Sequence, residues 1–350
     1  MLKKTLLSTA VTVALALSAG QPSAVMIDMV GGSGAGLLNN GSTAVHDVVT
    51  LDWKPDNAIA IGAISTPTKA QGGPTAAGQL ADERYIQNVA QGKLNSFGVS
   101  GGGQVGTEIT PGNYLQNREF TFQASFYTFT SGIGTATVAN RLAPGESFFR
   151  LYADSAKDSS DITGAGYGNG KLILEGKLST LTGSFTDFTR LGAPTDQLDK
   201  FGGDNQSGVR THVGNGSNTL GINITFLDNA YFLGDVAKLL LTLNYNDTTN
   251  LATPFISANP SDSVVGVVPS YSLNGGGQKV NGADCVSGFT SDQKPIFTGQ
   301  TEAGVNSNRC DFHFQSDASG AFQVPEPGSL ALVGLALSAV GFAGRRRKAA

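Results

Sequence analysis

The chain has 350 residues, a formal net charge of −4 and 47 glycines, and charged residues make up 14% of it. Glycine averages about 7% and charged residues about a quarter of ordinary proteins, so this composition predicts many turns and a neutral surface, typical of an extracellular all-β protein. No basic cluster lies between residues 25 and 324. Nucleic-acid binding depends on such clusters to displace counterions from phosphates, which excludes that class of partner.

The N-terminus predicts a secretory signal peptide over residues 1–24. Lys3 and Lys4 precede an apolar run over residues 6–17, and small residues follow at positions 18–20. A basic start, an apolar centre and a small-residue end make a signal that signal peptidase removes. Cleavage after Gly20 and cleavage after Ala24 both fit the sequence.

Alternation of apolar residues is the clearest structural signal in the body, residues 25–324. Three series show it: Phe120, Phe122, Ala124 and Phe126; Leu220, Ile222, Ile224 and Phe226; and Leu239, Leu241, Leu243 and Tyr245. Further strands are expected at residues 45–53, 58–64, 147–152, 171–178, 184–188 and 209–213, while residues 80–90 fit either a helix or a strand. The pattern predicts an all-β fold, a two-sheet sandwich or jelly-roll-like body with long Gly/Asn-rich loops.

A glycine-rich segment holds the one match to a catalytic motif. Residues 98–102 fit the G-x-S-x-G pattern of a hydrolase nucleophile elbow. That elbow needs a buried strand before it and a helix after it, and the flanking residues predict neither. We therefore expect a chance match, no catalytic residues and no enzymatic activity.

The loop with Asp154, Asp158 and Asp161 offers carboxylate oxygens suited to Ca²⁺. Ala156 and Lys157 stand where further oxygen ligands would be needed, so a solvated Asx-rich turn is favoured over a calcium site. Trp53, the one tryptophan, fits a sugar-stacking role, but its place in an alternating strand favours the core.

Apolar residues thin out over residues 246–324, which predicts long loops before the C-terminal signal. Cys285 and Cys310 are the two cysteines of the chain. In an exported protein a disulfide between them is expected, and closing a loop of roughly 25 residues stabilises by about 3 kcal/mol in the chain-entropy model.

The last residues predict a membrane anchor. Residues 328–344 contain no charge and no proline, and as a helix they would span roughly 26 Å, close to the thickness of a membrane core. The basic side chains that follow resist translocation, so they should remain cytoplasmic. They are Arg345, Arg346, Arg347 and Lys348.

The order of Val324, Pro325, Glu326 and Pro327, then the apolar helix, then the basic tail, resembles the PEP-CTERM sorting signal of exported proteins in Gram-negative bacteria that make exopolysaccharide. The resemblance implies that an exosortase recognises the Pro-Glu-Pro segment within residues 325–350 and removes the helix. The protein would be anchored transiently in the inner membrane and then reach the cell surface or matrix. Without both terminal signals, residues 25–324 carry 17 basic and 26 acidic residues, a net charge of −9.

Several body segments resemble flocculation-associated PEP-CTERM proteins in the same order. They are residues 51–60, 148–154, 164–174 and 198–202. The resemblance implies a factor that promotes aggregation into flocs or biofilm together with exopolysaccharide, with self-association as a further possibility. A calcium-dependent adhesin and a polysaccharide-modifying enzyme remain the alternatives.

Overall fold

The computed structural model describes residues 24–28, 44–63, 66–106, 118–161, 163–194, 196–197, 210–233, 240–249, 264, 286–289, 295–297 and 312–323. Antiparallel strands dominate these residues, with short 3-10 turns at Lys69–Gln71 (η1) and Thr189–Leu191 (η3). The predicted all-β class is confirmed. None of the helical segments in this described part has the length and hydropathy needed to span a membrane. The anchor expected at residues 328–344 lies outside it.

The strands are β1 (Val25–Asp28), β2 (Ala44–Trp53), β3 (Asp56–Ile61), β4 (Arg84–Val99), β5 (Gly103–Gly106), β6 (Glu119–Ser131), β7 (Thr137–Leu142), β8 (Phe148–Asp154), β9 (Lys171–Asp187), β10 (Asp196–Gln197), β11 (Arg210–Thr211), β12 (Gly214–Leu227), β13 (Phe232–Leu233), β14 (Leu240–Thr248), β15 (Val286–Phe289), β16 (Pro295–Phe297) and β17 (Phe312–Gln323).

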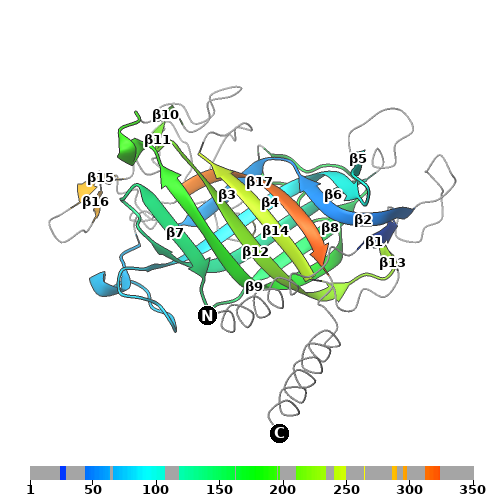
Figure 1. The fold of residues 1–350 in the computed structure, drawn as a ribbon, viewed down its shortest axis with the longest axis horizontal. Helices are drawn as coiled ribbons and strands as arrows, with labels where there is room; N and C mark the ends of the chain where they lie inside the picture. Colours follow the sequence, from blue (N-terminus) through cyan, green and yellow to red (C-terminus); the bar gives the residue numbers. More distant parts are fainter. Residues whose placement is uncertain are drawn as a thin grey trace, which may run out of the picture.

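Thirteen of these strands form one sheet that closes on itself. From β4 the hydrogen-bonded order runs through β3, β17, β14, β12, β9, β7 and β6, and β6 pairs again with β4. Figure 1 shows β12, β14 and β17 side by side across the face turned to the viewer. Every strand of this ring has a partner on both sides, so the ring offers no open edge to another chain.

Two positions in the ring hold a pair of shorter strands placed end to end. β2 and β3 together fill the space between β4 and β17, and β7 and β8 fill that between β6 and β9. Pro55 and Pro144 lie at the two junctions. Proline has no amide to give to a ladder, which explains why the strand is interrupted at each of them.

This closed sheet differs from the expected two-sheet sandwich. Strands β4, β9 and β12 are 14 to 17 residues long, so each pairs along most of its length with neighbours on both sides. The expected strands at 171–178 and 184–188 are one strand, β9, and residues 84–90 of the ambiguous segment are part of β4. Alternation identified the buried face of each strand, but it holds no information on which strands are neighbours.

Strand β17 occupies part of the segment that we expected to be loop-rich. It pairs with β14 on one side and with β2 and β3 on the other, and so completes the ring. Its buried positions include the small residues Ser316, Ala318 and Gly320. A Cβ on Gly320 would come within 2.9 Å of the Leu243 side chain, so the interior is too narrow here for the large apolar residues that mark a strand in sequence.

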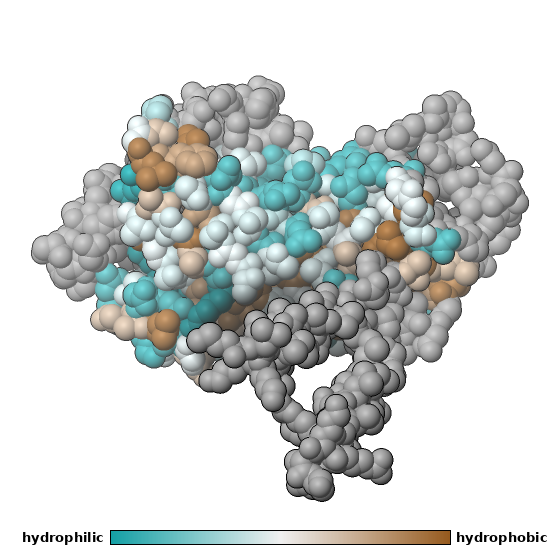
Figure 2. Space-filling model, viewed as in Figure 1, coloured by the Kyte–Doolittle hydropathy of each residue, from teal (hydrophilic) through white to brown (hydrophobic). Residues whose placement is uncertain are grey.

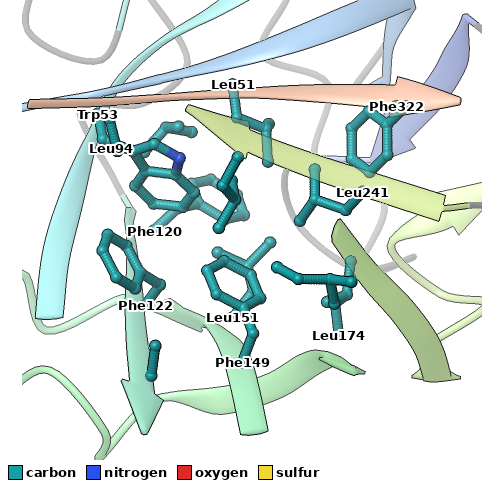
Figure 3. Close-up of a cluster of buried hydrophobic side chains, with 14 of the residues drawn as sticks. Leu51, Trp53, Leu94, Phe120, Phe122, Phe149, Leu151, Leu174, Leu241 and Phe322 are labelled. Carbon is teal, nitrogen blue, oxygen red and sulfur yellow. The ribbon is translucent and has the colours of Figure 1, made fainter. Parts of the chain in front are cut away.

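An aromatic and aliphatic core lies inside the ring, and Figure 3 shows part of it. Trp53 is 1% exposed, as the core assignment predicted, and its ring meets Phe122 edge to face at 4.7 Å. Phe122 stacks on Phe149 with 5.3 Å between ring centroids. The expected series ending in Phe226 departs from alternation at its end, because a register shift between Ile224 and Phe226 leaves Phe226 43% exposed.

Phe149→Ala should lower the free energy of unfolding by about 3 to 5 kcal/mol, because it removes a fully buried ring that contacts both Trp53 and Phe122. Phe148→Ala is the matched control on the same strand. That ring is only half-buried and lies under the Arg150 guanidinium, 4.3 Å from its centroid, so the expected loss is about 1 kcal/mol. Denaturant unfolding measures both values, and equal losses would contradict the core described above.

Candidate functional site

The sorting and cysteine predictions concern residues beyond the described structure. Val324, Pro325, Glu326, Pro327 and the basic tail at 345–348 lie outside the described residues. Cys285 and Cys310 also lie outside them, so their disulfide stays a prediction.

The calcium candidates separate into two groups. Asp154 and Asp158 lie together with Glu119, with one ligand atom from each within 4.8 Å of the others. Glu119 was missed because it is far away in sequence and reaches Asp154 only through the pairing of β6 with β8. Glu119 already accepts hydrogen bonds from the Ser159 amide and hydroxyl, at 2.9 and 2.6 Å. Lys93 Nζ lies 3.2 Å from a carboxylate oxygen of Glu119 as well. The solvated turn stays the prediction, with calcium binding as its alternative.

Asp161 joins a different, buried group. The Tyr167 hydroxyl lies 2.5 Å from carboxylate oxygens of both Asp161 and Asp56. Burial, and then the nearby Asp161, raise the pKa of Asp56 well above its usual range. The tyrosine hydroxyl is the donor to both carboxylates and so holds the two acids together. This network fastens the acidic loop to β3.

The segment that fits the G-x-S-x-G pattern, residues 98–102, is part of a β-hairpin. Residues 98 and 99 end β4, and residues 100–102 connect it to β5. Gly101 and Gly102 adopt positive φ angles of 91° and 88°, which suit glycine in a tight turn. A strand does precede the serine, contrary to expectation, because β4 continues to Val99. A strand follows it, and a nucleophile elbow needs a helix there.

The outer face of β9, β12, β14 and β17 presents rows of hydroxyl and amide side chains. One row runs Ser184, Ser217, Asn246, Asp317 across the four strands, and the next runs Thr182, Thr219, Asn244, Ser319. We call this the hydroxyl–amide face; its members are these eight residues with Thr180 and Asn215, all exposed. Asp317 is its one charged member. Figure 2 shows this side mainly in white and teal.

A groove crosses the hydroxyl–amide face. It measures about 680 Å³ and is lined from all four strands, by residues that include Ser184, Ser217, Asn246 and Asp317. Pro55 lies at one side of it. Neighbouring strands are about 4.8 Å apart, so each row offers hydrogen-bonding groups at regular intervals over roughly 15 Å across the four strands.

Inside the ring, a second polar arrangement faces the core. Hydrogen bonds link side chains from six strands, one to the next, and we call these residues the polar belt: Asn88, Thr128, Thr130, Asn140, Asn218, Asp247 and Ser316. Asn140 reaches Asn218 across β9 because the residue between them is Gly183, where a Cβ would lie 2.0 Å from the Asn218 side-chain oxygen.

Asp247 is the one acidic member of the belt. It is 6% exposed and accepts hydrogen bonds from the Ser316 hydroxyl at 2.5 Å and from the Asn218 amide. Burial raises its pKa to about 6, although both hydrogen bonds act in the opposite direction. Sequence contained a signal for this position, because Asp247 continues the alternating series that ends in Tyr245.

A cavity of about 130 Å³ lies beside the belt, lined by all eight positions of the ring. Its apolar wall includes Phe126, Phe185, Phe312 and Phe314. Asp187, Arg190 and His212 also line it, and His212 Nδ1 lies 2.5 Å from a carboxylate oxygen of Asp187. The side chains of the other two histidines, His46 and His313, lie outside the described part.

The raised pKa of Asp247 predicts a pH-dependent stability. A carboxyl whose pKa is higher in the folded state than its unfolded value of about 4 binds a proton more readily when folded. Asp247 therefore makes its full contribution to the free energy of unfolding below pH 4 and loses it as pH rises through about 6. The contribution is at most about 3 kcal/mol. Asp247→Asn should flatten this part of the curve of unfolding free energy against pH. An unchanged curve in the variant would contradict the assignment.

The comparisons with known proteins concern the C-terminus. Residues 323–348 match the family model of the PEP-CTERM protein-sorting motif. No curated protein and no solved structure matches the chain. The motif indicates an exported protein that is targeted to exosortase through its C-terminus. The chain is therefore a PEP-CTERM sorting-domain-containing protein.

Proposed function

We propose that this protein, once processed by exosortase, acts at the cell surface or in the extracellular matrix, where it promotes cell aggregation together with exopolysaccharide. The sorting motif accounts for export. The proposed activity is binding without catalysis, and the body that reaches the exterior is the closed sheet with its two polar arrangements.

The hydroxyl–amide face is the observation that supports a polysaccharide partner. Sugar hydroxyls both donate and accept hydrogen bonds, and so do the Ser, Thr and Asn side chains of this face. The open groove across four strands matches an extended chain better than a single small molecule. Contacts of this kind are individually weak, so many copies acting on one polymer would supply the strength of attachment.

Cell settling tests both parts of the proposal. A strain deleted for this protein should settle less, and the native sequence should restore settling. Glu326→Ala should fail to restore it, because the change removes the acid between the two prolines of the sorting motif. Ser217→Glu should be exported normally yet restore settling only in part, because it adds a charge to the centre of the hydroxyl–amide face.

Thr75→Glu is the matched control, since Thr75 is exposed and neither belongs to that face nor lines its groove. Full restoration by this variant together with partial restoration by Ser217→Glu supports the face as the contact surface. Settling that is unaffected by the deletion would overturn the aggregation role, and equal restoration by both charge variants would overturn the role of the face.

The three carboxylates Glu119, Asp154 and Asp158 favour a calcium-dependent adhesin as the second candidate. In that case millimolar Ca²⁺ should raise the melting temperature of the protein, and a chelator should reverse the effect. Asp158→Asn should abolish the shift, whereas Asp82→Asn, at an exposed position outside the cluster, should retain it. A melting temperature independent of Ca²⁺ would rule out this candidate.

A further inference from the structure

The cavity inside the closed sheet has the size of a ring-shaped molecule. Its volume is about 130 Å³. Apolar protein cavities of about 150 Å³ hold benzene, so a six-membered ring is close to the largest body that this space accepts. The cavity lies inside the ring of strands, whereas the groove of the hydroxyl–amide face lies on its outer surface.

The wall of the cavity suits a cation as well as a hydrocarbon. Phe312 stacks against Phe314 with ring centroids 6.0 Å apart and meets Phe185 edge to face at 5.4 Å. Aromatic faces carry negative charge density, so they attract a desolvated cation that lies near them. The same rings bury hydrocarbon well.

Asp247 places a carboxylate on this wall. It is 6% exposed, and within the described part of the chain no Lys, Arg or His forms an ion pair with it. Buried charges are ordinarily paired, because an unpaired one loses the solvation that water supplied. Its two hydrogen-bond donors, Ser316 and Asn218, are neutral and leave its negative charge uncompensated.

A second buried group on the same wall lacks a partner. Tyr245 lies two residues before Asp247 on β14, and the inward alternation of the strand brings both to the cavity. The side chain is 5% exposed, and its hydroxyl has no hydrogen-bond partner among the described residues. A buried hydroxyl without a partner has lost its hydrogen bonds to water, and a ligand that hydrogen-bonds to it would restore one of them.

We propose that this cavity binds a small organic amine with one ring, its ammonium group at the Asp247 carboxylate and its ring among Phe185, Phe312 and Phe314. The ammonium supplies the cation that Asp247 lacks. It has three N–H donors, enough to bond to the Asp247 carboxylate and to the oxygen of Tyr245 together. An anion of the same shape would be repelled by the negative charge of Asp247, and a neutral alcohol would leave that charge unpaired.

Calorimetry with three probes of matched shape tests the proposal on the purified full chain. Benzylamine should bind at pH 7.5 at least tenfold more tightly than benzyl alcohol, and benzoate should not bind. Asp247→Asn should weaken benzylamine at least tenfold and leave benzyl alcohol unchanged. Asp82→Asn is the control, because it removes an exposed carboxylate that does not line the cavity, and it should bind benzylamine as the native protein does.

The pH dependence separates charge pairing from simple burial. Benzylamine should bind more tightly as pH rises from 5 to 7.5, since Asp247 loses its proton over that range while the amine stays charged. The other titratable groups that line the cavity are Asp187, Arg190, His212 and Tyr245. Asp247→Asn retains them, so any change of benzylamine affinity with pH that remains in this variant measures their contribution.

Val138→Phe provides a test that leaves the belt intact. Val138 lines the cavity from β7, and the larger side chain should fill it and abolish binding of both benzylamine and benzyl alcohol. Equal affinities for amine and alcohol would overturn the proposal in favour of a purely apolar site. Benzylamine binding that survives both Asp247→Asn and Val138→Phe, or no binding to the native protein, would overturn it outright.

Discussion

Closure of the sheet is the constraint on which the other features depend. Once β6 pairs with β4, every strand of the ring has two neighbours, and alternate residues must face a shared interior of fixed width. That width explains why Gly183 and Gly320 occupy inward positions where a Cβ would collide with a neighbour. It also leaves one volume to be divided between the aromatic core around Trp53 and the cavity beside the polar belt.

The interior holds both apolar and polar side chains. Aromatic and aliphatic side chains pack around Trp53, and a run of hydrogen bonds from Asn88 to Ser316 lies beside the cavity, whose wall also includes Phe126 and Phe185. Buried polar groups are tolerated when each has a partner, and in the belt they nearly all do. Asp247 lacks a counter-charge among the described residues, and the Tyr245 hydroxyl lacks a hydrogen-bond partner there. These two groups set the chemistry proposed for the cavity.

The outer surface and the sorting motif are consistent with one another. A protein targeted to exosortase leaves the cytoplasm, and the composition of this chain favours neutral hydroxyl and amide side chains over charged ones. The closed sheet then arranges these side chains in straight rows, because pairing of β9, β12, β14 and β17 without offset aligns outward residues across four strands. Within the ring each strand is paired on both sides, and among the described strands of this sheet β5 and β13 lie outside the ring with one partner each.

The sequence by itself determined the all-β class, the buried faces of most strands and the C-terminal motif, because alternation and a motif depend only on residues that are close together in sequence. Only the tertiary structure decided that the sheet closes, that β17 belongs to it and that Glu119 meets Asp154, because these depend on pairing between distant segments. The inward place of Asp247 lay between the two. The alternation of Leu243 and Tyr245 indicates that the side chain of Asp247 points to the same, inward face. Only the packing around it shows that this acid is buried beside a cavity.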